Sequence, residues 1–253
     1  MIEIKVAKKE QSASIARLIM MDALMMCCAL LLLACGGKKT PSININRYYH
    51  MKRLSLAIIF ASFTLAVAAQ EGFRVDYQGT RPTIKDFVKA YLTSILSEEV
   101  EECEAEGLGI YESLQRAITN KEKGLPLNEG ETLTIDTKNG FLLYEQARDE
   151  NLSRIEMCFW NESDGKHKLF ADNNWYYRNG KPILGQFGGL NFFRYNNSTK
   201  RMSYIDAPGF DVEVYDKAYA LPRTGKDIIV TTWHEDGKKT QKTLKWNGHG
   251  FSY

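Results

Sequence analysis

The sequence has few cysteines and almost no excess of charge of either sign. Five cysteines in 253 residues are too few for a disulfide scaffold. The chain carries 33 Lys and Arg against 31 Asp and Glu, a net charge of +2. A nucleic-acid binder needs a basic excess on one face, so this balance favours no nucleic-acid partner.

Motifs of common catalytic and metal sites are missing as well. The sequence contains no Cys-x-x-Cys pair, no His-Glu-x-x-His and no Gly-x-Ser-x-Gly elbow. The stretch nearest to a phosphate loop, 221–227, fails because Ala220 and Asp227 stand where glycine and Ser or Thr are needed. We therefore predict no metal and no cofactor, assign no catalytic residue, and favour a protein that is not an enzyme.

Residues 51–69 have the order of a secretory signal peptide. Lys52 and Arg53 form a short positive segment, an apolar run follows, and Ala66-Val67-Ala68 supplies the small residues of a cleavage site. The apolar run is short for a membrane span. We predict that 51–69 export the chain to the periplasm, the outer surface or the medium.

Residues 1–50 precede this signal and contain a second apolar run, which ends in Leu32-Leu33-Ala34-Cys35. This ending resembles a bacterial lipobox, and the resemblance implies lipidation of Cys35. Two export signals in series are hard to reconcile. Either Met51 is the true start and 1–50 are not part of the fold, or the protein is a lipoprotein anchored at Cys35. That anchor is the one membrane contact we predict.

Residues 1–19 also resemble the first strand and helix of the GNAT acetyltransferases. That family binds the phosphates of acetyl-CoA with a loop of the form Arg/Gln-x-x-Gly-x-Gly/Ala. The nearest match is Gln186 with Gly189, and Asn191 stands where the second small residue belongs. We therefore do not expect acetyltransferase activity.

Cleavage of the signal would leave residues 70–253 as a single secreted domain. These residues carry 24 Lys and Arg against 28 Asp and Glu, a net charge of −4. Their length suits one domain with a core of useful size. Only Cys103 and Cys158 remain in it, and the sequence is equally compatible with one disulfide between them and with two free thiols.

Two helices are predicted at the start of this domain. Apolar residues in 82–97 recur at helical spacing, and Thr83 has an acidic residue three positions later, as in a capping box. We expect Gly107 and Gly109 to break the helix, and a second, weaker helix to follow over 111–120.

From residue 131 onward the pattern is that of strands joined by tight turns. All four tryptophans lie here, with five Asn-Gly or Asp-Gly dipeptides, which tolerate the positive φ of hairpin turns. We predict hairpins at 131–147, 153–171, 174–186 and 227–246, and further strands near 189–195, 201–205 and 211–219.

These elements predict an α+β fold. The helices of 82–120 are amphipathic and should pack on one face of a curved or sandwiched antiparallel sheet built from the hairpins of 131–253. No helical pattern alternates with the strands, so a parallel α/β sheet is disfavoured.

Two sets of residues are candidates for a functional site. Trp175, Tyr177 and Tyr195 belong to an aromatic cluster that would suit stacking against sugar rings, although a sheet of this size should bury most of its aromatic rings in the core. Asp211 and Glu213 would share one face of a strand, a spacing compatible with acid–base catalysis and also with an exposed strand face.

Residues 70–253 have the general sequence character of a known group of proteins, most clearly in the segments Gly79–Thr83, Leu221–Asp227 and Lys245–Gly248. They resemble the small secreted domains of unknown function of the Bacteroidota. The resemblance implies export and brings no catalytic residues. Three functions remain open: a non-catalytic binding or interaction module for a glycan or an envelope protein, a secreted hydrolase of glycan or peptide, and a lipoprotein component of an envelope assembly.

Overall fold

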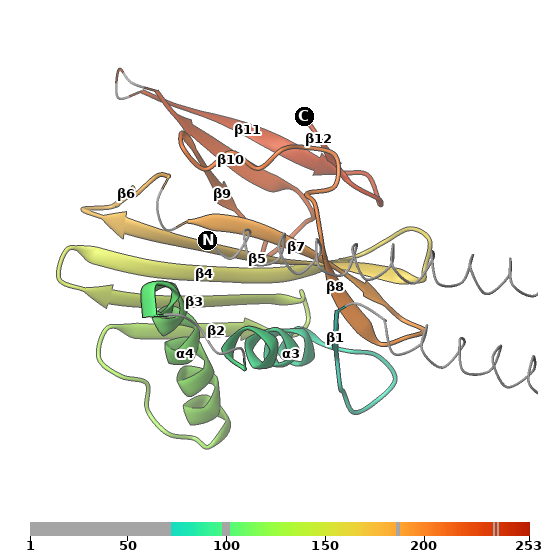
Figure 1. Ribbon diagram of the computed structural model, residues 1–253. Coiled ribbons are helices and arrows are strands. Elements are labelled where there is room, and N and C mark those ends of the chain that lie inside the picture. The colour runs from blue at the N-terminus through green and yellow to red at the C-terminus, as the bar shows by residue number, and fades with distance from the viewer. Residues whose placement is uncertain (1–71, 98–101, 186–187, 235, 237) are drawn as a thin grey trace, which may run out of the picture. The chain divides into compact units, whose positions relative to one another are not determined.

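The fold is known from a computed structural model, shown in Figure 1. The residues it describes are 72–97, 102–185, 188–234, 236 and 238–253, without the side chains of 102–107. Gly72–Tyr253 form one compact unit. The predicted signal peptide at 51–69 and the candidate lipidation site Cys35 lie outside the described residues.

Two antiparallel sheets make up most of the described chain. The larger has eight strands: β1 (Phe73–Arg74), β8 (Arg201–Ile205), β7 (Gly189–Asn196), β5 (His167–Arg178), β4 (Asn151–Asn161), β3 (Phe141–Arg148) and β2 (Glu131–Asp136) in spatial order, with β6 (Lys181–Pro182) paired to β5. The smaller has four: β12 (Phe251–Ser252), β11 (Lys239–Trp246), β10 (Ile228–Trp233) and β9 (Lys217–Ala220). The antiparallel sheets predicted from the sequence are confirmed.

The turn dipeptides lie where the sequence indicated. Asn139-Gly140 joins β2 to β3, Asp164-Gly165 joins β4 to β5, and Asn179-Gly180 joins β5 to β6. Gly140 has a φ of +69°, and a Cβ there would come within 2.7 Å of the Phe159 ring. Only glycine fits this turn, because both its backbone angle and its neighbour exclude a side chain.

The predicted strand at 211–219 is wrong over most of its length, because β9 begins only at Lys217. The backbone N–H of Glu213 donates to the Tyr219 hydroxyl at 2.9 Å, and the Val214 carbonyl accepts from the Gly185 N–H at 2.8 Å. A side chain and a loop thus satisfy backbone groups that strand pairing would otherwise satisfy. Asp211 and Glu213 consequently do not lie on a strand.

The first helix, α3 (Ile84–Leu96), forms as the sequence predicts. The Thr83 backbone N–H and hydroxyl both donate to the Asp86 carboxylate at 2.7 Å, which completes the capping box. The buried side chains of α3 are Ile84, Phe87, Val88, Tyr91 and Leu92.

The second helix, α4 (Glu102–Glu122), runs through Gly107 and Gly109, so the predicted break is wrong. Each glycine costs a helix about 1 kcal/mol relative to alanine. The buried stripe of Ile110, Tyr111, Leu114 and Ala117 offsets that cost by packing. No helix in the described part of the chain is long and apolar enough to cross a membrane.

The described chain is mainly β. The sequence predicts its two helices as the first elements of the domain, but the short strand β1 precedes them. The larger sheet is covered on both faces. Leu169, Ala171 and Trp175 of β5 belong to the core shared with the smaller sheet. Phe170 alternates with them and contacts Phe87 of α3. Helices and smaller sheet therefore pack on opposite faces (Figure 1).

Asp172, at the middle of β5, connects both helices to the sheet. Its Oδ2 accepts hydrogen bonds from the Tyr91 hydroxyl of α3 at 2.9 Å and the Tyr111 hydroxyl of α4 at 2.7 Å. The residue is fully buried, and Oδ1 accepts no hydrogen bond of good geometry from the described residues. Ionisation of this buried carboxylate costs free energy, because Oδ1 has no such donor to stabilise the negative charge.

Burial raises the pKa of Asp172 from 3.8 to about 6, against the hydrogen bonds from Tyr111, Tyr91 and, last, Asn191, which lower it. Between these two pKa values the folded protein holds a proton that the unfolded chain has released. The contribution of Asp172 to stability therefore falls as pH rises through this window, and it is complete only below the unfolded pKa.

We predict that Asp172→Asn removes this pH dependence. The amide oxygen still accepts from both tyrosine hydroxyls, but the side chain no longer ionises. From pH 7.5 to pH 4, the unfolding free energy of the wild type should rise relative to the variant by about 2 kcal/mol. Urea denaturation across this range measures the difference. Parallel curves for the two proteins would contradict the assignment.

Candidate functional site

The three aromatic residues expected to form a stacking platform do not share a surface. Trp175 is 1% exposed, packs against Tyr219 and donates its indole N–H to Asn173 at 2.7 Å. Tyr195 is fully buried on the helix side, where its ring contacts Phe87. Tyr177 is half-buried beside the core between the sheets. The structure places Trp175 and Tyr195 in two different layers of the core.

Of the two cysteines considered for a disulfide, the structure describes the side chain of Cys158. Cys158 is a free, buried thiol in the core between the two sheets. Cys103 lies in α4, which packs on the opposite face of the larger sheet, and its side chain is outside the described residues. Burial raises the pKa of the Cys158 thiol well above its ordinary value, so the thiol is unreactive.

The candidate carboxylates also do not form a catalytic pair. Glu213 forms an ion pair with Lys217, which holds its carboxylate at the edge of β9. Both residues precede β9 in a loop, so no strand aligns their carboxylates for a shared reaction.

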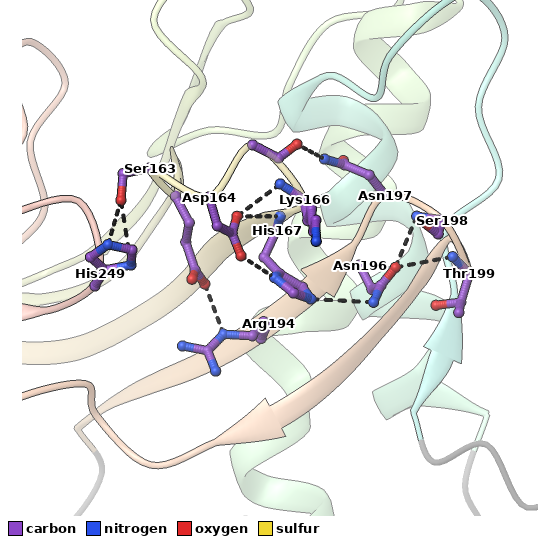
Figure 2. Close-up of polar contacts among 12 residues, drawn as sticks. Ser163, Asp164, Lys166, His167, Arg194, Asn196, Asn197, Ser198, Thr199 and His249 are labelled. Carbon is purple, nitrogen blue, oxygen red and sulfur yellow. Dashed lines mark hydrogen bonds and ion pairs between the residues drawn. The ribbon is translucent and has the colours of Figure 1, made fainter.

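A different cluster gathers polar groups from three distant parts of the chain (Figure 2). It consists of the turns 162–166, 197–200 and 247–250, together with the bordering strand residues His167, Arg194 and Asn196. We call it the three-turn surface. Most side chains of these turns are exposed.

Each turn folds around one Asp or Asn side chain. Asp164 Oδ1 accepts from the backbone N–H groups of Lys166 and His167 at 2.8 and 3.0 Å. Asn196 Oδ1 accepts from Ser198 and Thr199 at 2.8 and 3.1 Å, and Asn247 Oδ1 accepts from His249 and Gly250, both at 2.9 Å. Such side chains replace backbone partners, which explains why short polar residues stand at these positions.

Hydrogen bonds to backbone carbonyl groups then connect the turns to one another. The Asn197 N–H donates to the Lys166 carbonyl at 2.9 Å, and its side chain donates to the Gly165 carbonyl at 3.0 Å. The Ser163 N–H donates to the Gly248 carbonyl at 2.9 Å. The sequence marked Asp164-Gly165 and Asn247-Gly248 as turns, but no local signal shows that they meet.

Glu162, Asp164 and His167 are the residues of the three-turn surface that could together bind a metal ion. Their ligand atoms lie within 4.8 Å of one another, and their residue types are those that bind divalent metals. Glu162, however, forms an ion pair with Arg194 at 2.8 Å, and Asp164 bonds His167 Nδ1 at 2.6 Å. Both carboxylates are therefore already engaged.

The surrounding hydrogen bonds assign the His167 tautomer. Asn196 Oδ1 is held by two backbone N–H groups, so its amide nitrogen faces His167 Nε2 at 3.2 Å and donates to it. The neutral ring then carries its proton on Nδ1 and donates to Asp164. This bond and the turn N–H groups lower the pKa of Asp164 to about 2. A metal would have to displace that proton, so the arrangement fits a hydrogen-bonded recognition surface better than a metal centre.

Ser163 and His249 form a second pair on this surface, with Oγ and Nε2 2.5 Å apart. A serine nucleophile needs a base that a third group orients. Among the described residues, no carboxylate bonds His249. The pair ties two turns together and has no group that would orient it for catalysis.

We predict that Arg194→Met destabilises the domain by about 1–3 kcal/mol, because it leaves the carboxylate of Glu162 buried without its cation. The Glu162 side chain is only 5% exposed, whereas Arg194 is 40% exposed. The double variant with Glu162→Gln should recover most of the loss. Urea denaturation in a double-mutant cycle measures the coupling, with the exposed Arg178→Met as the matched control. Additive single effects would show that the pair is not coupled.

Comparison with known proteins identifies no relative. No protein-family model matches the chain, and no curated protein or solved structure matches it either. The chemistry of the three-turn surface is therefore argued from its own geometry.

Proposed function

We propose that the protein is an exported, non-catalytic binding module of the periplasm or cell surface, and that its partner binds the three-turn surface. The observation that supports this most is the fastening of three turns, far apart in sequence, into one exposed polar surface. Binding loops on a rigid scaffold are a common way to present a recognition surface.

The chemistry of the surface suits recognition of a polar partner. It offers hydroxyl, amide, imidazole and ammonium groups from Ser198, Asn197, His249 and Lys166, all of them exposed. Hydrogen bonds hold the backbone of each turn before any partner arrives, so little entropy would be lost on binding. A glycan or a polar face of an envelope protein has complementary groups.

Hydrolysis is the less supported alternative. The sequence predicts that hydrolysis would use carboxylates on a sheet, but Asp211 and Glu213 do not lie on a strand. Ser163 and His249 contact each other without an orienting carboxylate among the described residues. Both arrangements lack the mutual geometry that a catalytic site needs.

Substitutions on the three-turn surface should weaken binding without unfolding the domain. A glycan array and photo-crosslinking from position 198 in the native envelope would first identify the partner. We expect Lys166→Ala with His249→Ala to lower the affinity about tenfold, because polar groups at a binding surface then lose their partners.

His234→Ala is the matched control, since His234 is also exposed in a turn but belongs to the β10–β11 hairpin. The affinity of the His234→Ala variant for the identified partner should stay within about twofold of the wild type. Equal losses in both variants, or crosslinks from position 234 as well as 198, would contradict the proposed surface.

The proposed export has its own test. Mass spectrometry of the native N-terminus should find a first residue at Ala69 or Gln70, because the small residues before it form a signal-peptidase site. A diacylglyceryl group on Cys35 would instead support the lipoprotein component of an envelope assembly. An intact Met1 would contradict export by either route.

A further inference from the structure

The charge of the domain is divided unevenly between its two parts. Residues 217–253, which form the smaller sheet, carry seven Lys and Arg against three Asp and Glu. Residues 72–216 carry 17 against 24. An anionic partner would be attracted to the smaller sheet and repelled by the remainder.

The two longest strands of the smaller sheet present an outer face away from the core. Ile228, Val230 and Leu244 are buried between the sheets. Alternation then turns Ile229, Thr231 and Trp233 of β10 outward, opposite Thr243, Gln241 and Lys239 of β11. We call these six residues, together with Lys245, the outer sheet face.

This face combines an aromatic ring, neutral hydrogen-bonding groups and lysines. Gln241 donates to the Thr231 hydroxyl at 3.2 Å, which fixes both side chains in the middle of the face. Lys239 lies 5.4 Å from the centre of the Trp233 ring. The other three tryptophans pack against aromatic rings, whereas the aromatic or cation–π contact of the Trp233 ring among the described residues is this lysine, and its indole nitrogen is buried without a hydrogen-bond partner there.

The lysines at the two ends of the outer sheet face form no ion pair within the described part of the chain. Lys239 and Lys245 are exposed, and neither forms an ion pair with any residue that the structure describes. They are six residues apart on one side of the strand, roughly 20 Å. That distance matches several sugar units of an extended polysaccharide, and the Thr and Gln side chains lie between them.

We propose that the outer sheet face binds a linear acidic polysaccharide. Lysines at the two ends would contact carboxylate or sulfate groups. Thr231, Gln241 and Thr243 would bond hydroxyls, and the Trp233 ring with Ile229 would contact the apolar faces of sugar rings. Nucleic acid is less suited, because the face has no arginine and only one aromatic ring. This surface is separate from the three-turn surface and does not depend on its proposed role.

The test is affinity electrophoresis of the full chain in gels that contain polygalacturonate, dextran sulfate, neutral dextran or polyphosphate. The first two probes distinguish carboxylated from sulfated sugars. We expect retardation by at least one of them and none by neutral dextran. The variant Lys239→Glu with Lys245→Glu should weaken this retardation about tenfold, because both ends of the site then repel the ligand.

The matched control is Lys85→Glu with Lys89→Glu, the same charge change at two exposed positions of α3. It should keep the wild-type retardation within about twofold. The inference is overturned if both double variants lose binding equally, or if polyphosphate binds as well as the acidic sugars. It is also overturned if Lys166→Ala with His249→Ala abolishes retardation, since the sugar would then bind the three-turn surface. No retardation by either acidic sugar overturns it outright.

Discussion

One buried carboxylate, that of Asp172, joins both helices to the centre of the larger sheet. Tyr91 of α3 and Tyr111 of α4 donate to the same oxygen, so neither helix can shift without breaking that contact. The position of Asp172 on β5 also fixes the side-chain alternation of the strand. Because Asp172 faces the helices, Ala171 must face the smaller sheet, and a shift of one residue would place Asp172 against the smaller sheet and exchange the residues of the two covered faces.

A second buried polar group performs the equivalent role between the sheets. Glu156 of β4 accepts from the backbone N–H of Leu221 at 2.8 Å and from Asn173 at 3.0 Å. Asn173 also donates to the Tyr219 carbonyl at 2.9 Å. Burial raises the pKa of Glu156 against these hydrogen bonds. Apolar packing alone would hold the sheets together in several registers, whereas these directed bonds are satisfied in one.

The sequence predicts the parts of this fold that depend on neighbouring residues. The hairpins follow from Asn-Gly and Asp-Gly turns, and α3 follows from its apolar stripe and the capping box at Thr83. The predictions fail where contacts between residues far apart in the sequence determine the local structure. Packing of its buried stripe carries α4 through Gly109, and the Tyr219 hydroxyl takes the place of a strand partner at Glu213. Aromatic rings such as Trp175 looked like a platform because composition does not show which face of a strand is covered.

The same distinction explains why neither proposed surface was visible in the sequence. The three-turn surface exists only because Asn197 and Ser163 bond turns that lie far apart in the chain. The outer sheet face exists only because the alternate residues of β10 and β11 are committed to the core. In both places the exposed side chains contribute little to packing, whereas Asp172 and Glu156 hold the layers from within. At exposed positions that neither fold nor connect a turn, such as Lys166 and Ser198, the sequence is therefore free to suit a partner without loss of the fold, which is the physical condition for a binding module on a stable scaffold.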